Sequence, residues 1–243
     1  CLCAEVNVVL VTICITGFRG RMVEARRNHA ITNIMAAPLA IPLVIIGART
    51  ASGVTGRCEI TGVTSGVTRS TSSLNVPREN HTALTLADGQ ILAVAGRGAN
   101  GQVLSSVEQF DVETEVWSLV SNLNTARADF GIFLIPGGAE FMVAGGIDVN
   151  GNALNTVEMY DPGAKAFRVI ATLNEARINP TLAFSEDYRF MAVCGGTDGT
   201  NILDTVEVVD VRAESIVANF RLLAPRVGGT FSILGNGNTK ASA

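Results

Sequence analysis

The chain has 243 residues, 47% of them hydrophobic and 16% charged, with a formal net charge of −4 at pH 7. Basic residues form no cluster in the sequence, which excludes nucleic acid and anionic membrane surfaces as favoured partners. A chain of this length can fold as one large all-β unit with a sizeable core. The mean hydropathy of +0.33 is high for a soluble monomer and indicates that a partner covers some apolar surface.

Five arginines divide the chain into units of nearly equal length. They are Arg26, Arg78, Arg127, Arg177 and Arg226, with spacings of 52, 49, 50 and 49 residues. A glutamate stands 19 residues before each arginine from the second onward: Glu59, Glu108, Glu158 and Glu207. A fixed period of this size is typical of repeat architectures.

Taken in chain order, residues 1–24 are predicted to supply the third and fourth strands of an incomplete unit, because Glu5 precedes Arg26 by a similar 21 residues. Residues 225–243 supply the complement, a first strand after Arg226 and a second in the tail. We expect the two halves to complete one sheet, which leaves no unpaired edge. Alternatively, each half pairs with a neighbouring copy and the protein is a filament subunit.

Residues 25–76 read as a divergent unit. The uncharged run 34–48 is shorter than the roughly 20 residues of a membrane-spanning helix and contains Pro38 and Pro42, so we predict no transmembrane segment. Its end is instead an apolar second strand. The Thr-, Ser- and Gly-rich stretch 50–73 predicts an irregular outer edge.

Residues 77–125, 126–175 and 176–224 each predict four short strands separated by turn residues. Asp88-Gly89 marks the hairpin between the first two strands. Turns between the second and third strands are marked by Asn100-Gly101, Asn150-Gly151 and Asp198-Gly199. Four-stranded sheets of this size cannot bury both faces alone, and stacking them around an axis solves that problem.

These units resemble the kelch repeat. The resemblance is carried by the opening arginine, the glycine pairs Gly145-Gly146 and Gly195-Gly196, and the Val-Glu-x-(Phe/Tyr)-Asp element with Trp117 or Phe167 six residues later. It is close over 78–224 and degenerate over 26–76, where Gly47-Ala48 replaces the glycine pair. It implies an all-β, kelch-like β-propeller of about five four-stranded blades in one domain, 1–243, with one blade completed by both termini. Members of the family are mostly interaction modules and occasionally enzymes.

The repeat arginines are predicted to lie together where one unit passes to the next. Two interpretations are open: a positive collar that binds an anionic peptide or sugar acid, or a tie from each guanidinium to carbonyls or a repeat glutamate. The turns vary between units and offer a contact surface at Asn100, Asp148, Asn150, Asp198 and Asn201, although turn chemistry alone explains these residues. The candidate binding residues are therefore these five together with Arg26, Arg78, Arg127, Arg177 and Arg226.

Two enzyme alternatives follow from the resemblance. A copper radical oxidase needs two histidines and two tyrosines at the metal, and the chain has only His29, His81, Tyr160 and Tyr188. The histidines fall at repeat positions and the tyrosines at expected strand positions, so we predict no catalytic residues. A carbohydrate-active propeller would use carboxylates, but Glu108, Glu158 and Glu207 recur with the repeat and are expected to serve the fold.

The five cysteines lack zinc-site spacing, and Cys58 and Cys194 are expected to be buried in strands. Cys1 fits a lipid anchor, without the polar tether such an anchor usually has. Asn80 begins the sequon Asn-His-Thr. We therefore predict a non-enzymatic interaction or structural module without metal or cofactor, which binds a protein partner or itself and favours an extracellular or cell-surface location.

Overall fold

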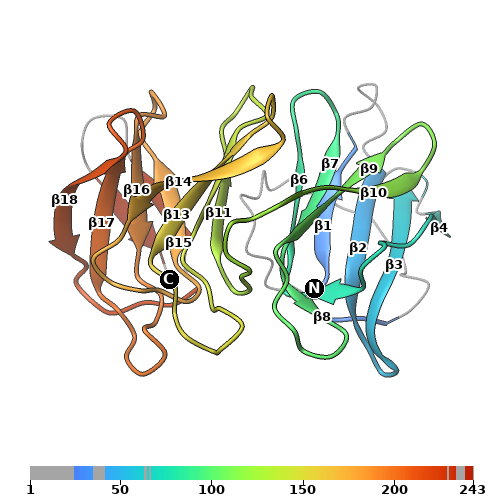
Figure 1. Cartoon of the computed structure of the whole chain (residues 1–243), viewed down its shortest axis with the longest axis horizontal. Helices are drawn as coiled ribbons and strands as arrows, with labels where there is room; N and C mark the ends of the chain where they lie inside the picture. The colour runs from blue at the N-terminus through green and yellow to red at the C-terminus, as the bar shows by residue number, and fades with distance from the viewer. Residues whose placement is uncertain are drawn as a thin grey trace.

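The structure is a computed structural model that describes residues 25–34, 42–62, 65, 67–228, 230–233 and 239–242. Within these residues every regular element is a β-strand, and the strands form antiparallel sheets (Figure 1). The same residues include no helix of the length and apolarity needed to span a membrane. The prediction of an all-β fold is confirmed.

Four sheets of four strands follow one another along the chain, and we number them I to IV. In Figure 1, sheets I and II lie on the right and sheets III and IV on the left. Sheet I consists of β1 (Ala30–Asn33), β2 (Pro42–Thr50), β3 (Gly53–Gly62) and β4 (Thr68–Ser70). Sheet II consists of β6 (Thr82–Thr85), β7 (Ile91–Val94), β9 (Ser106–Asp111) and β10 (Val116–Asn122).

Sheet III consists of β11 (Gly131–Leu134), β12 (Phe141–Ala144), β13 (Thr156–Asp161) and β14 (Ala166–Thr172). Sheet IV consists of β15 (Thr181–Phe184), β16 (Phe190–Cys194), β17 (Thr205–Asp210) and β18 (Ser215–Arg221). In all four sheets the order in space follows the order in the chain, because short turns join antiparallel neighbours.

Two smaller sheets complete the described residues. A short ladder joins β5 (Arg78–Glu79) to β8 (Arg97–Gly98). Sheet V pairs β19 (Thr230–Ile233) with β20 (Thr239–Ser242), the two strands expected near the C-terminus. The strands predicted to complete this sheet belong to residues 1–24, which lie outside the described residues, so closure of the ring within one chain stays a prediction.

Side chains alternate along each inner strand so that every middle sheet is buried on both faces. In β7, Ile91 and Ala93 pack toward sheet I, whereas Leu92 and Val94 pack toward sheet III. In β12, the next equivalent strand, Phe141 and Val143 face sheet II and Met142 and Ala144 face sheet IV. Burial of a large apolar side chain contributes about 1.5–3 kcal/mol, so sheets II and III each gain their core from two neighbours.

The first strands of successive sheets lie next to one another. Strand β1 contacts β6, β11 contacts β15, and β15 contacts β19. The turns predicted from Asp-Gly and Asn-Gly pairs are confirmed. Asp88-Gly89 lies between the first and second strands of sheet II, and the other three pairs lie between the second and third strands of sheets II, III and IV. Radial stacking of small sheets, as expected from the sequence, explains this set of contacts.

Sheet I is the most irregular of the four. Its second and third strands are longer than their counterparts, and β2 contains a bulge between Ile46 and Ala48. Its outer strand β4 has only three residues, and Arg69 and Ser70 in it are exposed. This agrees with the irregular edge expected for the Thr- and Ser-rich stretch.

Both described cysteines are free and buried. Burial raises the pKa of the Cys58 thiol to about 11 and that of the Cys194 thiol to about 12. They are therefore protonated hydrophobic side chains at neutral pH, as expected. Cys1 lies outside the described residues, and a lipid anchor there stays a prediction.

Candidate functional site

The repeat arginine Arg127 fastens two sheets together. The main chain of Arg127 is held by the preceding sheet, because its N–H donates to Leu104 O (3.0 Å) and its carbonyl accepts from Gly96 N (3.1 Å). Its guanidinium enters sheet III, where it donates to Gly145 O (2.8 Å) and to the carboxylate of Glu158. One residue therefore links sheets II and III through both its backbone and its side chain.

The same arrangement recurs at the neighbouring junctions. Arg78 donates to Ala95 O (3.0 Å) and Glu108 (2.7 Å), and Arg177 donates to Gly195 O (3.0 Å) and Glu207 (2.9 Å). The side chains of Arg78, Arg127 and Arg177 are 0% exposed. Burial lowers the pKa of Arg78 and Arg127, and the paired carboxylates oppose that effect.

An asparagine completes each buried ion pair. Asn124 donates its N–H (2.8 Å) and its Nδ2 (3.1 Å) to Glu158, and Asn75 and Asn174 do the same to Glu108 and Glu207. The carboxylate oxygens are thus occupied by an arginine, an asparagine and backbone N–H groups, the arrangement that makes a buried charge tolerable. The sequence reasoning anticipated the arginine tie but not the asparagine, which lies outside the motifs it used.

These contacts match the second interpretation of the repeat arginines, the tie to carbonyls and glutamate. Arg26 belongs to the same group, since its side chain is buried and pairs with Glu59. Arg226 is bound through its backbone to Leu203 and Gly196, and its Nε and Nη1 are buried without a hydrogen-bond partner among the described residues. A binding role for these five arginines stays a prediction, and for the fully buried ones it would require the junction to open.

The glycine that ends the second strand lets the next junction approach. Gly145 has φ of +63°, and a Cβ on it would collide with the carbonyl oxygen of Arg177. Sheet II has Ala95 at the equivalent position, with φ of +54°. Left-handed backbone is unfavourable for a residue with a Cβ, so the junction after sheet II is less relaxed than the one after sheet III.

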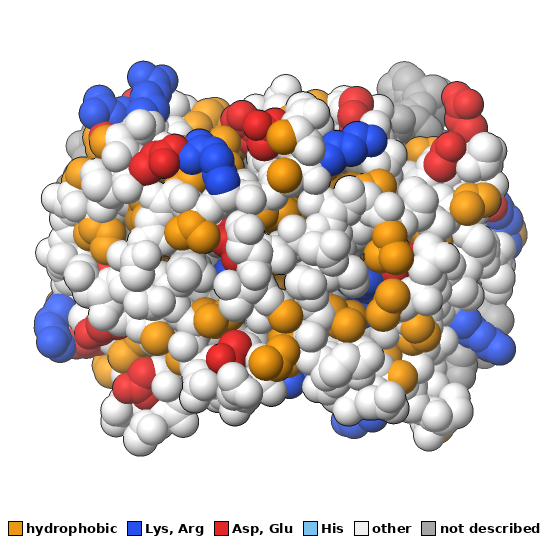
Figure 2. All heavy atoms as spheres, in the orientation of Figure 1, with side chains coloured by type: hydrophobic (Ala, Val, Ile, Leu, Met, Phe, Trp, Pro, Cys, Tyr) orange, Lys and Arg blue, Asp and Glu red, His pale blue; other side chains and the backbone are white. Residues whose placement is uncertain are grey.

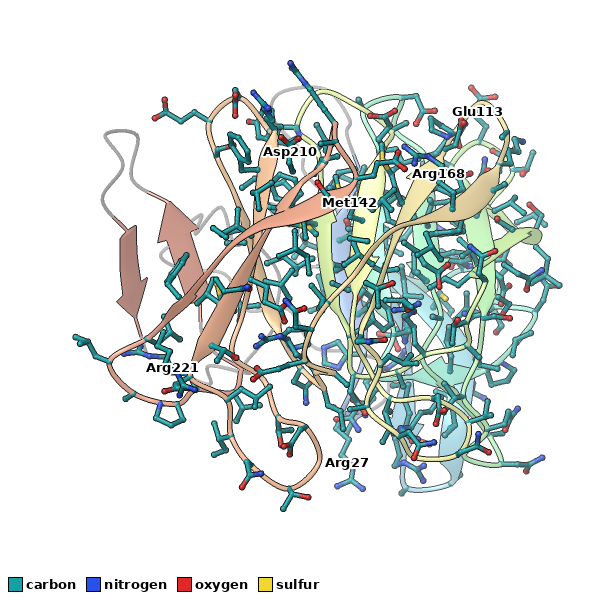
Figure 3. The ribbon with its side chains drawn as sticks, turned by 60° about the vertical axis from the view of Figure 1, so that its left-hand side comes forward. Arg27, Glu113, Met142, Arg168, Asp210 and Arg221 are labelled. Carbon is teal, nitrogen blue, oxygen red and sulfur yellow. The ribbon has the colours of Figure 1, made fainter. Side chains whose placement is uncertain are left out.

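The residue after each repeat arginine forms a bridge that differs from sheet to sheet. The bridge pairs Arg27 with Arg49 in sheet I and Glu79 with Arg97 in sheet II. The equivalent pairs in sheets III and IV are Ala128 with Ile147 and Ile178 with Thr197. We call the end of the sheets that carries these bridges the junction end; Figure 3 shows Arg27 there and Glu113 and Asp210 at the opposite, hairpin end.

Charged side chains form a network across the junction end of sheets I and II. The Nε of Arg49 lies 2.9 Å from both carboxylate oxygens of Glu79, which also accepts from Asn28 (3.1 Å). The hydrogen bond from Arg49 holds the pKa of Glu79 below its usual value. Asp129 accepts from Arg97 (3.2 Å) and from Asn80 (3.1 Å).

This network bears on glycosylation at Asn80. The Nδ2 of Asn80, the atom that would carry a glycan, donates to Asp129, and the residue is partly buried with φ of +49°. Glycosylation at this position therefore stays a prediction that the geometry disfavours.

The loop candidates also lie at the junction end. Asn100, Asn150, Asp198 and Asn201 are exposed, and Asp148 is partly buried. Asp148 accepts from the N–H groups of Asn150 and Asn152 (both 2.8 Å), and Asp198 accepts from that of Asn201 (2.6 Å). These backbone hydrogen bonds lower the pKa of Asp148 and Asp198. The turns are thus rigid and polar, and a contact role for them stays a prediction.

The structure does not bring the histidines and tyrosines together. Tyr160 is buried in β13 and stacks on Phe141 (4.9 Å between ring centroids). The expected strand position of Tyr188 is wrong: this residue lies in the turn between β15 and β16 with φ of +53°, because the hairpin of sheet IV needs a left-handed residue there. Over the ranges that the structure describes, no three His, Cys, Asp or Glu side chains are grouped as a metal site would require.

His81 is buried without a hydrogen bond to either ring nitrogen within the described residues. Burial, aided by Arg78 and His29, lowers its pKa to about 3. His29 is partly buried, and burial is also the main reason that its pKa is lowered. His81 is therefore neutral at physiological pH and serves as an unsatisfied core residue rather than as an acid or base.

A surface pocket of about 410 Å³ opens at the junction end of sheet I and is lined by Ala25, Arg26, Arg27, Arg49, Thr50 and Ala51. The sequence reasoning did not select Arg27 or Arg49, because it considered only the recurring residues and the turns. The available signal was the charge of Arg27, whose position is taken by Glu79, Ala128 and Ile178 in the next three units. On the face drawn in Figure 2, the hydrophobic side chains of the described residues lie in small separate groups.

Comparison with known proteins agrees with this geometry. The kelch motif matches residues 80–124 and 140–174, which lie within sheets II and III and their junctions. A solved structure titled "Structure of YjhT" superposes with a TM-score of 0.64 at 13% identity, over 89% of this chain and 72% of that chain. This likeness supports the fold alone. No curated protein matches the chain significantly.

Proposed function

We propose that the chain, a β-propeller with kelch motifs, acts as a non-enzymatic interaction module that binds a protein partner through the junction end of its blades. Sheets I to IV are four of these blades. Kelch repeats typically mediate protein interactions, which favours this class of function. A single domain over 1–243 and a place at a cell surface are parts of the same proposal.

The proposal rests on one contrast between two kinds of polar residue. The repeat arginines Arg78, Arg127 and Arg177 and their glutamates are buried and paired with one another. Polar residues that differ between blades are present at the junction end, in the turns at Asn100, Asp148 and Asp198 and in the bridges of sheets I and II. Residues that recur in every blade support the blade, whereas residues confined to one blade are free to specify a ligand.

In a second version of this proposal, the partner is another copy of the same chain. If the terminal half-sheets paired with neighbouring copies, the chain would form an open assembly rather than a closed ring. Native mass measurement separates these cases, because a closed ring is a monomer at all concentrations and an open one grows with concentration.

The function is tested by capture on the immobilised full chain from an extract of the cells that produce it. One variant carries Asn100→Ala, Asn150→Ala and Asn201→Ala at the junction end. Its matched control carries Glu113→Ala, Glu186→Ala and Glu214→Ala at the hairpin end. We expect the wild type and the control to retain the same protein in stoichiometric amount and the junction-end variant to lose it. Equal retention by all three, or no stoichiometric protein, would overturn the proposal.

A further inference from the structure

We propose that Arg27 and Arg49 bind an oxyanion, the carboxylate or phosphate group of a ligand, in the pocket at the junction end of sheet I. The proposal names the chemistry that the junction end recognises and thus rests on the proposed function.

The first argument is the direct opposition of two like charges. Arg27 and Arg49 form an antiparallel bridge with reciprocal hydrogen bonds, Arg27 N to Arg49 O (3.0 Å) and Arg49 N to Arg27 O (2.8 Å). Side chains at such a bridge leave the backbone with Cβ atoms about 4.5–5.5 Å apart, and like charges there are destabilising. The equivalent bridge in sheet II joins Glu79 to Arg97, so an opposite charge occupies the position of Arg27.

The second argument is the charge balance of the pocket. Arg26 is paired with Glu59, and Arg49 is paired with Glu79. The guanidinium of Arg27 has no hydrogen-bond partner among the described residues, although it lies near enough to Glu79 to act on it electrostatically. Among the described residues, three guanidinium groups thus share two carboxylates, which leaves one positive charge at the pocket without a carboxylate partner there.

The third argument is access. Arg27 is exposed, and Figure 3 shows its side chain projecting from the junction end beyond the ribbon. The side chain of Arg49 is 36% exposed, and because Glu79 takes its Nε and Nη2, its Nη1 remains available to the pocket. A volume of about 410 Å³ admits an oxyanion together with part of the group that carries it.

Guanidinium groups favour this ligand for geometric reasons. The planar fork of arginine donates two parallel N–H bonds that match the two oxygens of a carboxylate or phosphate. Glu79 and Asp129 repel anions on the side of sheet II, so the oxyanion lies on the opposite side of Arg27, toward Ala25 and Thr50.

The test is a binding titration of the full chain with three probes at low ionic strength: citrate, inorganic phosphate and a fluorescently labelled hexaglutamate peptide. Labelled hexaglutamine is the neutral control. The variants are Arg27→Gln, Arg27→Glu and, as a control with the same charge change at the hairpin end, Arg168→Gln, which Figure 3 places far from Arg27. Thermal unfolding of each variant verifies that it is folded.

We expect the wild type and Arg168→Gln to bind at least one anionic probe with similar affinity and not to bind hexaglutamine. Arg27→Gln should weaken that binding about tenfold or more, the loss of about 1.4 kcal/mol, and Arg27→Glu should abolish it. Binding of citrate and hexaglutamate assigns the site to carboxylates, and binding of inorganic phosphate alone assigns it to phosphate.

The proposal is overturned if no anionic probe binds, or if Arg27→Gln binds as well as Arg168→Gln. These outcomes are distinct from failure of the proposed function. A chain that still captures its protein partner after Arg27→Gln would retain that function and lose only the oxyanion site.

Discussion

Two sets of arginines have opposite environments in the structure. Arg78, Arg127 and Arg177 recur with the repeat, have side chains that are 0% exposed, and each pairs with a buried glutamate. Arg27 and Arg49 do not recur in every sheet, although Arg97 of sheet II stands at the position of Arg49; they face each other across a bridge and reach solvent. The comparison teaches that recurrence, not residue type, separates the side chains that hold the blades from those that can meet a ligand.

The largest effect is expected where the recurring set is broken. Glu158→Ala removes the carboxylate that Arg127 and Asn124 contact and leaves a buried guanidinium uncompensated. Loss of one partner of such a pair costs about 3–5 kcal/mol of unfolding free energy. Equilibrium urea unfolding measures it, with the exposed Glu113→Ala as a control that should stay close to the wild type. Equal unfolding free energies for the two variants would show that the buried ion pair stabilises the protein no more than an exposed glutamate does.

A smaller effect is expected at the strand end that meets the next junction. Gly145→Ala forces a Cβ into left-handed backbone and against Arg177 O, which should destabilise the protein by about 1–3 kcal/mol. The converse change in sheet II, Ala95→Gly, relieves a left-handed residue and should leave stability unchanged or raise it. Thermal and urea unfolding of both variants check the pair. If Gly145→Ala leaves the unfolding free energy unchanged, the glycine is not needed to let the Arg177 carbonyl approach the end of β12.

The third effect depends on pH. His81 has a folded-state pKa of about 3, below the value of about 6.5 in the unfolded chain, because burial disfavours its charged form. The unfolded state alone binds a proton between these values, so stability is full above pH 6.5 and falls as pH drops, by about 2 kcal/mol at pH 5.

His81→Leu removes both unsatisfied nitrogens and this proton uptake. We expect the variant to match or exceed the wild type at pH 7.5 and to exceed it by about 2 kcal/mol more at pH 5. Urea unfolding at the two pH values measures the difference. If the difference in unfolding free energy between the variant and the wild type is the same at pH 5 as at pH 7.5, His81 is not a source of acid sensitivity.

Much of the fold could be predicted from periodicity, because the recurring positions are the ones that packing dictates. The recurrence of Arg127 and Glu158 allowed a tie between arginine and glutamate to be given as one of two interpretations, and the structure shows that contact. The role of Asn124 was missed, although Asn75, Asn124 and Asn174 each stand three residues before a repeat arginine. Recurrence alone does not distinguish an asparagine that donates to a buried carboxylate from one that shapes a turn.

The candidate site was less predictable for the same reason. Arg27 and Arg49 are 22 positions apart, and only the bridge between the start of one unit and its second strand brings them opposite each other. Tyr188 was misplaced because its aromatic side chain suggested a strand, whereas the hairpin imposes a left-handed turn. For residues confined to one blade, the structure must show which side chains are neighbours before a binding or structural role can be inferred.

The most direct test of the comparison is the unfolding free energy of two single arginine variants, Arg127→Gln and Arg27→Gln, measured side by side in urea. Both changes remove one guanidinium. We predict that Arg127→Gln loses about 3–5 kcal/mol, because it leaves Glu158 buried without its cation, and that Arg27→Gln is as stable as the wild type or more so. Similar losses for both variants would contradict the division between arginines that hold the blades and arginines that are free to bind.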